Sequence, residues 1–291
     1  MDRDRLAKHP CFSKQAHHKY GRVHMPVAPA CNIQCRYCTR KFDCANESRP
    51  GVTSRVLTPS EAMERVRAVA GRDGRVTVVG VAGPGDPLAN RGTYELMGMV
   101  QREFPELTMC ISTNGLLLVD RLDELVGLGL DTLTVTINSV YPDTAERLYS
   151  WVRYKGKVAR GPEAVRLLLK NQWLGLRAAV NAGLAVKVNS VMVPGINDAE
   201  IEQVAELAGG LGATTLNIIP LIPNAEFAGM DAPKADELAG LRLRCGLYIP
   251  VMSHCRQCRA DAAGLLGDDK DMETETLMAL MGEEYACSVA M

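Results

Sequence analysis

The sequence predicts an α/β fold in which parallel strands curl into a partial (β/α)6-type barrel. Runs rich in Val, Leu and Ile, without polar alternation, recur along the chain, as expected of parallel strands buried on both faces. These runs cover residues 76–81, 107–112, 133–137, 185–191 and 215–219. Helical stretches alternate with them at 93–103, 120–128, 143–149, 162–181 and 198–209. A chain of 291 residues is long enough for one α/β domain of this size.

A first strand at 23–30 precedes these repeats, and a long polar loop separates it from the first helix. Thr58-Pro-Ser-Glu61 predicts the start of that helix, because proline and an acidic residue suit a first turn. We divide the chain into an N-terminal extension at 1–22, the barrel at 23–225 and a C-terminal extension at 226–291. The C-terminal extension is expected to pack on the barrel, so that the whole forms a single structural domain.

Composition and charge exclude several classes of protein. The 33 basic and 34 acidic residues are well mixed, so no basic field favours nucleic acid. The sequence has neither an apolar run of about 18 residues nor a signal peptide, and no membrane partner is expected. Ten cysteines suggest metal ligation, because reducing compartments keep thiols out of disulfides. We therefore expect a cytoplasmic, metal-binding monomer.

Three of the cysteines lie on one short loop after the first strand, at the spacing C-x3-C-x2-C. Cys31, Cys35 and Cys38 can bind three irons of one [4Fe–4S] cube, which leaves the fourth iron open for a substrate. The other interpretations are a zinc loop or unconnected buried thiols. Zinc sites usually have four ligands in C-x2-C-type pairs, so the spacing favours an iron–sulfur cluster.

Polar turns follow several of the predicted strands, at the edge of the barrel where reacting groups are expected. Each turn alone is an ordinary Gly- or Asn-rich turn. Together, on the same edge as the cysteine loop, they predict a rim that binds substrate. The candidates are, in chain order, Gly83, Gly85, Asp86, Ser112, Asn114, Asn138, Asn189 and Ser190.

The cysteine loop, with the aromatic Tyr37 before its last cysteine, resembles the cluster loop of radical S-adenosylmethionine (SAM) enzymes. Gly83-Pro-Gly85-Asp86-Pro87 resembles their Gly-Gly-Glu-Pro element, whose backbone holds the SAM amino group. It differs by its central proline and by the shorter acid Asp86. The resemblance implies a partial TIM barrel, and it matches four other rim residues to positions that bind the SAM carboxylate and ribose: Asn114, Asn138, Asn189 and Ser190.

Motifs along nearly the whole chain resemble the NifB family, the radical SAM proteins of nitrogenase cofactor assembly. Besides the cysteine loop they are Asn46-Glu-Ser-Arg-Pro-Gly51, Ala82-Gly-Pro-Gly-Asp-Pro-Leu88, Ser112-Thr-Asn-Gly115, Val193-Pro-Gly-Ile-Asn197 and Cys255-Arg-Gln-Cys-Arg-Ala-Asp-Ala-Ala-Gly264. The chain ends soon after the last motif. We therefore expect the stand-alone form of the family, without the NifX-like domain that some members carry.

The resemblance implies two auxiliary [4Fe–4S] clusters besides the SAM cluster. One ligand set would be Cys11 with the C-x2-C pair Cys255 and Cys258, and the other would be Cys44, Cys110 and His24. Period-two geometry supports part of this assignment, because Cys110 shares strand parity with Ser112 and Asn114. Family context also makes Glu47 and Arg49 candidates for the active site.

Ordinary structural roles and a zinc site are the alternatives to these assignments. Cys110 alone would be a small buried hydrophobe, and His24 alone a hydrogen-bonded structural histidine. His254 could convert the neighbouring C-x2-C pair into a zinc site. No role is assigned to the remaining thiols and imidazoles: Cys245, Cys287, His17 and His18.

The reaction that the resemblance implies uses SAM as both methyl donor and radical source, and it fuses the two auxiliary clusters into the [8Fe–9S–C] precursor of the nitrogenase cofactor. Its expected partners are an iron–sulfur cluster donor, a cofactor carrier or scaffold protein, and an electron donor such as a ferredoxin. One rival is another radical SAM enzyme, a peptide maturase or cofactor cyclase. Such enzymes usually place their extra cysteines in one C-terminal extension, whereas here they straddle the barrel. The other rival, an iron–sulfur carrier, does not need the SAM-type motifs.

Overall fold

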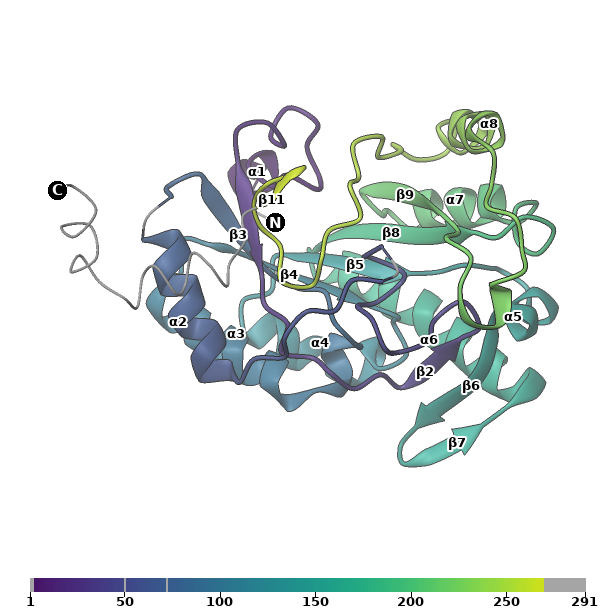
Figure 1. The fold of residues 1–291 in the computed structure, drawn as a ribbon, viewed down its shortest axis with the longest axis horizontal. Coiled ribbons are helices and arrows are strands. Elements are labelled where there is room, and N and C mark those ends of the chain that lie inside the picture. The colour runs from purple at the N-terminus through teal and green to yellow at the C-terminus, as the bar shows by residue number, and fades with distance from the viewer. Residues whose placement is uncertain (1–2, 50, 72, 270–291) are drawn as a thin grey trace, which may run out of the picture.

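A computed structural model describes residues 3–49, 51–71 and 73–269 of the chain. Its main feature is a curled sheet with helices on the outer face and long loops across the inner side (Figure 1). Six neighbouring strands are parallel and follow one another in chain order, which confirms the predicted partial (β/α)6-type barrel. They are β1 (Gly21–His24), β3 (Val76–Val81), β4 (Thr108–Thr113), β5 (Thr132–Thr136), β8 (Ala185–Met192) and β9 (Thr215–Pro220).

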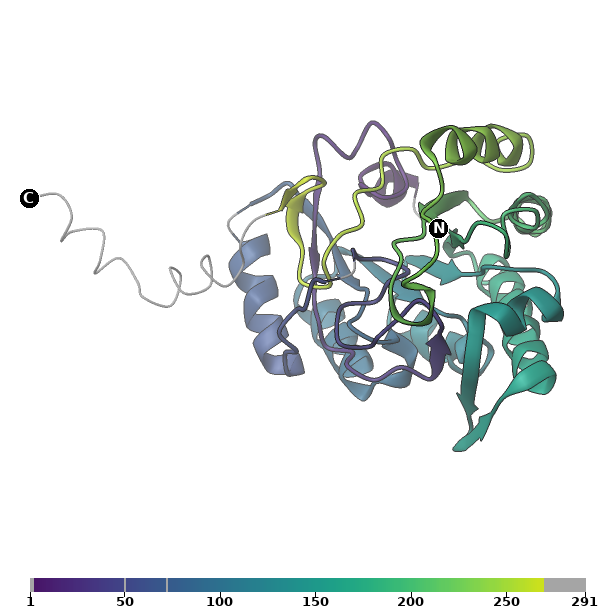
Figure 2. The same ribbon diagram turned by 45° about the vertical axis from the view of Figure 1, so that its right-hand side comes forward.

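Helices follow the strands and cover the outside of the sheet, as Figure 2 also shows. They are α2 (Pro59–Ala70), α3 (Arg91–Glu103), α4 (Leu118–Gly127), α5 (Pro142–Leu148), α6 (Gly161–Asn181), α7 (Ile201–Gly210) and α8 (Ala235–Cys245). Shorter elements are α1 (Arg3–Ala7) and the 3₁₀ turns η1 (Pro87–Ala89) and η2 (Ala225–Phe227). Helix α2 begins as predicted, since Thr58 and Glu61 form a reciprocal capping box.

Strand β8 shows how the sheet separates its two sides. All eight of its residues are buried. Val186 and Val188 pack in the hydrophobic core between sheet and helices, so Lys187 and Asn189, at the alternate positions, face the inner side. Polar side chains on a buried strand therefore collect inside the barrel, where they can contact a substrate.

A second, three-stranded sheet lies beside the barrel and was not predicted. It pairs β2 (Ile33–Cys35), inside the cysteine loop, with β6 (Tyr149–Tyr154), and β6 with β7 (Lys157–Ala159). Lys155 and Gly156 both have positive φ, as a tight hairpin turn requires. The run of aromatic and β-branched residues before this turn is a usual hairpin signal. In Figure 1 this hairpin projects from the lower right of the molecule.

The C-terminal segment extends the main sheet at the edge formed by β1. Strand β10 (Ala263–Leu265) pairs antiparallel with β1, and β11 (Asp268–Asp269) pairs with β10. This pairing brings the last described residues beside the N-terminal segment (Figure 1). Cys287 lies outside the described residues, as does the end of the predicted C-terminal extension. None of the helices in the described ranges combines the length and apolar character needed to span a bilayer.

Candidate active site

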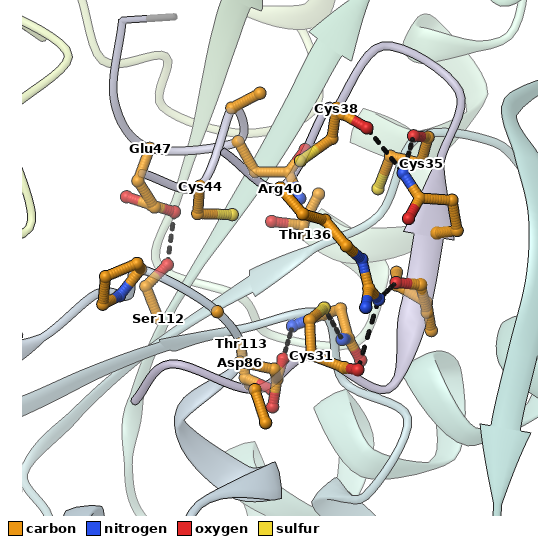
Figure 3. Close-up of a pocket in the computed structure, with 18 of the residues that line it drawn as sticks. Cys31, Cys35, Cys38, Arg40, Cys44, Glu47, Asp86, Ser112, Thr113 and Thr136 are labelled. Atoms are coloured by element: carbon orange, nitrogen blue, oxygen red, sulfur yellow. Dashed lines mark hydrogen bonds between the residues drawn. The ribbon is translucent and has the colours of Figure 1, made fainter. Parts of the chain in front are cut away.

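The three thiols of the cysteine loop line one cavity of about 290 Å³, here called the loop cavity (Figure 3). Cys35 lies on β2 and pairs with Tyr149 of β6, and the Cys38 N–H donates to the Cys35 carbonyl at 3.1 Å. The loop therefore folds back on itself, so that Cys31 and Cys38 face the same space. Burial raises the pKa of the Cys31 thiol to about 11, so ligation of a metal by this thiol would release a proton.

Gly85 lines the loop cavity and fixes the contact between two of its loops. Its N–H donates to the Ala28 carbonyl at 2.5 Å, and the Asp86 N–H donates to the Ala30 carbonyl at 2.8 Å. A Cβ atom added at Gly85 would overlap the Ala30 carbonyl oxygen. The segment that enters the cysteine loop thus lies directly against the turn after β3, and only glycine allows that approach.

Asp86 ties this turn to the end of β4. Its buried carboxylate, 3% exposed, accepts hydrogen bonds from the Leu88 N–H at 3.0 Å, Thr113 Oγ1 at 2.8 Å and the Asn114 N–H at 2.7 Å. Burial raises the pKa of this carboxyl, which the three donors oppose. Both oxygens are engaged within the protein, so Asp86 acts on the cavity through the loops it holds. Asn114 lines the cavity with its amide 3.8 Å from Cys31 Sγ.

Tyr37 links the cysteine loop to the centre of the barrel. The Tyr37 hydroxyl donates to Asn46 Oδ1 at 2.7 Å and accepts from Asn138 Nδ2 at 2.7 Å. Asn138 and Ser190 are fully buried, and the Ser190 hydroxyl donates to the Ile137 carbonyl at 2.5 Å. Tyr37 lines the loop cavity, whereas Asn138 and Ser190 do not. A direct contact of Asn138 or Ser190 with SAM stays a prediction.

Glu47 lies at the opposite end of the loop cavity from the cysteine loop (Figure 3). Its Oε1 accepts hydrogen bonds from Ser112 Oγ and, at 2.5 Å, from Asn189 Nδ2. Burial raises the pKa of this carboxyl, while the two donors and Lys187 oppose the shift. Ser112 and Asn189 thus both bond to the carboxylate of Glu47, and all three residues were predicted from the sequence. Arg49, the other candidate of this segment, is exposed and does not line the cavity.

A second set of thiols, here called the inner thiol group, lies beyond Glu47. Cys11, Cys110 and Cys255 come from the N-terminal segment, β4 and the C-terminal segment, and each interacts electrostatically with Lys187. Burial raises the pKa of Cys11 to about 11. Residues separated by more than two hundred positions in the chain are therefore brought to one place. The structure thus brings Cys11 and Cys255 together, two of the three residues predicted for one auxiliary cluster.

His24 adjoins this group at the end of β1. Its Nδ1 lies 3.2 Å from the Arg259 carbonyl, which can only accept, so Nδ1 carries the proton. Burial and the neighbouring Arg22 lower the pKa of His24 to about 3. A neutral imidazole with Nδ1–H on a carbonyl presents a free Nε2 lone pair, the usual state of a metal-binding histidine.

The C-terminal segment that carries Cys255 and Cys258 is held by bonds to distant parts of the chain. Asp43 Oδ2 accepts from the Ala260 N–H at 2.8 Å, and Ser48 Oγ donates to the Cys258 carbonyl at 2.5 Å. Arg22, fully buried, donates from a guanidinium nitrogen to Cys258 Sγ at 3.0 Å. These contacts explain how the C-x2-C pair reaches the barrel.

Cys44 is placed differently from the other predicted auxiliary ligands. It lines the loop cavity, and its electrostatic neighbours are Cys38, Cys31 and Cys35. Its joint ligation of one cluster with Cys110 and His24 stays a prediction. Among the described residues, no three His, Cys, Asp or Glu side chains lie close enough to bind a single metal ion. His254, the possible zinc ligand, instead has Nε2 3.0 Å from the Pro10 carbonyl.

Several residues of the site were missed by the sequence interpretation. Lys187 interrupts an apolar strand run, and Arg22 shares strand parity with His24; a charged residue inside such a run is itself a signal. Arg40 and Arg153 line the loop cavity and flank the Trp151 ring at 4.5 and 5.7 Å from its centre. Their placement depends on the hairpin, which was not predicted.

Comparison with curated proteins finds extensive similarity. The FeMo cofactor biosynthesis protein NifB of Klebsiella pneumoniae is 46% identical over 283 residues, which are 95% of this chain and 60% of that protein. NifB of Azotobacter vinelandii is 44% identical, over 93% of this chain and 55% of that protein. The chain spans between 53% and 60% of the length of three of the NifB relatives.

Solved structures show the same fold at low sequence identity. Streptococcus suis SuiB bound to S-adenosylmethionine gives a TM-score of 0.57 at 12% identity, covering 80% of this chain and 52% of that one. Methylornithine synthase (PylB) gives 0.54 at 15% identity, covering 92% and 83%. The radical SAM superfamily model matches residues 25–208, from the end of β1 to α7. This chain therefore belongs to the radical SAM superfamily, and it is similar to NifB proteins over nearly all of its length.

Proposed function

We propose that the protein uses SAM both as methyl donor and as radical source to fuse two [4Fe–4S] clusters, with one added sulfide, into the [8Fe–9S–C] precursor of the nitrogenase cofactor. The observation that carries this proposal is the presence of two thiol sets on either side of Glu47. Cys31, Cys35 and Cys38 line the loop cavity, and the inner thiol group surrounds Lys187. An enzyme that only cleaves SAM needs the first set, whereas assembly of a larger cluster needs both.

The loop cavity suits a resident [4Fe–4S] cluster with SAM beside it. The three thiols of the cysteine loop and Cys44 line it, while Asn114, Arg40 and Arg153 supply amide and guanidinium donors along the wall. When bound, such a cluster would offer an open iron that SAM can chelate, and it would supply the electron that cleaves the sulfonium bond of SAM. The two arginines can hold the SAM carboxylate, because guanidinium groups bind carboxylates with paired hydrogen bonds.

Glu47 is suited to accept a proton from the methyl group once that group lies on a substrate cluster. Burial raises the pKa of its carboxyl, which makes it a stronger base than an exposed glutamate. Ser112 and Asn189 hold Oε1 in place between the two thiol sets. One SAM would leave as S-adenosylhomocysteine after methyl transfer. A second, with one added electron, would leave as methionine and 5′-deoxyadenosine after hydrogen abstraction from the methyl group.

The two auxiliary clusters are substrates in this proposal and must arrive and leave. His24 suits this role, because a neutral imidazole donates less charge to iron than a thiolate and dissociates more readily. An iron–sulfur donor would load the inner thiol group, a ferredoxin-class protein would supply electrons, and a carrier or scaffold protein would accept the product. We place this chemistry in the cytoplasm, on a monomer.

Iron counting and product analysis test the proposal together. Anaerobically reconstituted protein should bind about twelve irons per chain, as three cubes require. Incubation with SAM and reductant should release both S-adenosylhomocysteine and 5′-deoxyadenosine. About four irons would refute cluster assembly, and 5′-deoxyadenosine without S-adenosylhomocysteine would refute the methyl-transfer step.

A further inference from the structure

The inner face of the sheet carries a lysine whose charge has no direct partner. Lys187, in the middle of β8, is only 5% exposed. Among the residues that the structure describes, its Nζ forms no hydrogen bond or ion pair; its nearest ring contact is Phe12, with the ring centre 6.0 Å away. A buried lysine normally pairs with a carboxylate or extends its amine to water. Lys187 has no such carboxylate partner in the described part of the chain.

The groups around Lys187 are those that become negative when a cluster binds. They are Cys11, Glu47, Cys255 and Cys110, in order of their effect on the amine. Glu47 is the one carboxylate among them, and its Oε1 is already bonded to Ser112 and Asn189. Glu47 is therefore the nearest anion that the described residues offer to Lys187, and it shares its charge with two other donors.

Lys187 also interacts electrostatically with members of both predicted ligand sets. Cys11 and Cys255 belong to one set and Cys110 to the other, and all three interact with the same amine. A [4Fe–4S]²⁺ cube with three thiolate ligands carries a net charge of about −1. A cube with two thiolates and a neutral imidazole carries no net charge in the same state, and reduction by one electron makes both cubes anionic. Reduced cubes repel one another in a medium of low dielectric constant, and a nearby cation reduces that repulsion.

We propose that Lys187 is a positioning residue whose ammonium group compensates the negative charge of the two substrate clusters and holds them close together. The inference rests on the proposed function and adds a residue to it. Lys187 then has two effects. It retains the anionic clusters while they are joined, and it favours their reduced, more negative state, which raises their reduction potentials.

Three variants separate charge from packing. Lys187→Met keeps the length of the side chain but removes the charge, Lys187→Arg restores the charge, and Lys170→Met removes an exposed lysine of α6 as a matched control. Each is purified without iron and after anaerobic reconstitution. Iron per chain, the thermal midpoint of the empty protein, and the midpoint potentials of the cluster signals that do not respond to SAM are then measured.

For Lys187→Met we expect the iron-free protein to melt at the same or a higher temperature than wild type, because a largely buried amine without a hydrogen bond or ion pair to any described residue is gone. We expect the reconstituted variant to lose iron from the auxiliary clusters. Those that remain should be at least tenfold harder to reduce, a shift of about 59 mV for one electron. Lys187→Arg should restore iron and potential, and Lys170→Met should resemble wild type.

The same measurements can overturn the proposal. Full iron content with unchanged potentials in Lys187→Met would refute it, as would a lower melting temperature of the empty variant, which indicates a purely structural lysine. If Lys187→Met binds no auxiliary iron, the melting temperature of the iron-free variant decides. The same or a higher temperature than wild type supports the proposal, and a lower one refutes it. Wild-type protein with only about four irons would refute the proposed function itself, and this inference with it.

Discussion

The loop cavity and the inner thiol group lie on either side of Glu47, yet they are built from different parts of the chain. Cys31, Cys35 and Cys38 come from one loop of eight residues, whereas the inner thiol group draws on both ends of the chain and on β4. The first site needs only a local turn and one short strand. The second exists only when β10 has paired with β1 and Asp43 has bonded to Ala260.

This difference has a functional consequence. A resident cofactor should be held by a rigid site, and the local loop, framed by Gly85 and Asp86, provides one. Under the proposed function, substrate clusters enter and leave, so a site closed by a terminal segment would release them when that segment opens. We expect the bonds from Asp43, Ser48 and Arg22 to that segment to affect access to the inner thiol group.

The largest expected effect comes from the loop cavity. Cys35→Ala removes a proposed ligand of the SAM cluster, so we expect 5′-deoxyadenosine formation to fall to background, at least about 10³-fold, with about four irons lost. Liquid chromatography of the products and iron analysis measure both. Cys245→Ala is the control: this buried thiol donates to the Ile201 carbonyl, away from both sites, and its loss should leave iron and products unchanged. Undiminished 5′-deoxyadenosine from Cys35→Ala would contradict the assignment.

The next effect separates the two sites. Cys255→Ser with Cys258→Ser should remove one auxiliary cluster, about four irons, while the SAM cluster keeps its paramagnetic resonance signal and still cleaves SAM. Since serine can still accept the hydrogen bond from Arg22, the fold should remain intact. Iron content equal to that of wild type would show that this pair binds no cluster. Loss of all iron would show that the two sites are not independent.

The sequence predicted the local features better than the tertiary ones. The strands and the cysteine loop depend on short-range pattern and spacing, and the six parallel strands were found in the predicted order. The hairpin of β6 and β7 was missed, although Lys155-Gly156 between aromatic residues is a turn signal. Lys187 was missed because a single lysine in an apolar run gives no indication of its neighbours. Those neighbours come from Cys11 and Cys255, which only the folded chain brings together.

A smaller effect should follow from loosening the C-terminal segment. Asp43 is buried and accepts from the Ser54 N–H at 2.9 Å, Ser54 Oγ at 2.7 Å and the Ala260 N–H. Asp43→Ala leaves these donors without a partner, so we expect the free energy of unfolding to fall by about 3 kcal/mol. The auxiliary clusters should be lost before the SAM cluster. Chemical denaturation and iron analysis measure the effect, with exposed Asp123→Ala as control. Equal loss from both sites would contradict separate closure of the inner thiol group.

The smallest effect tests the rigidity of the loop cavity without touching any thiol. In Gly85→Ala, the new methyl group meets the Ala30 carbonyl oxygen and must push the cysteine loop away from the turn after β3. We expect a loss of about 2 kcal/mol in stability and weaker SAM binding, while the auxiliary clusters keep their iron. Gly74→Ala is matched to it, because a Cβ there meets no atom within 4 Å, and its stability should change by less than about 0.5 kcal/mol. Denaturation curves and equilibrium binding of SAM to the reconstituted variants measure both quantities. Unchanged SAM affinity in Gly85→Ala would show that the loop cavity tolerates displacement of its wall, so that the contrast with the inner thiol group is not one of rigidity.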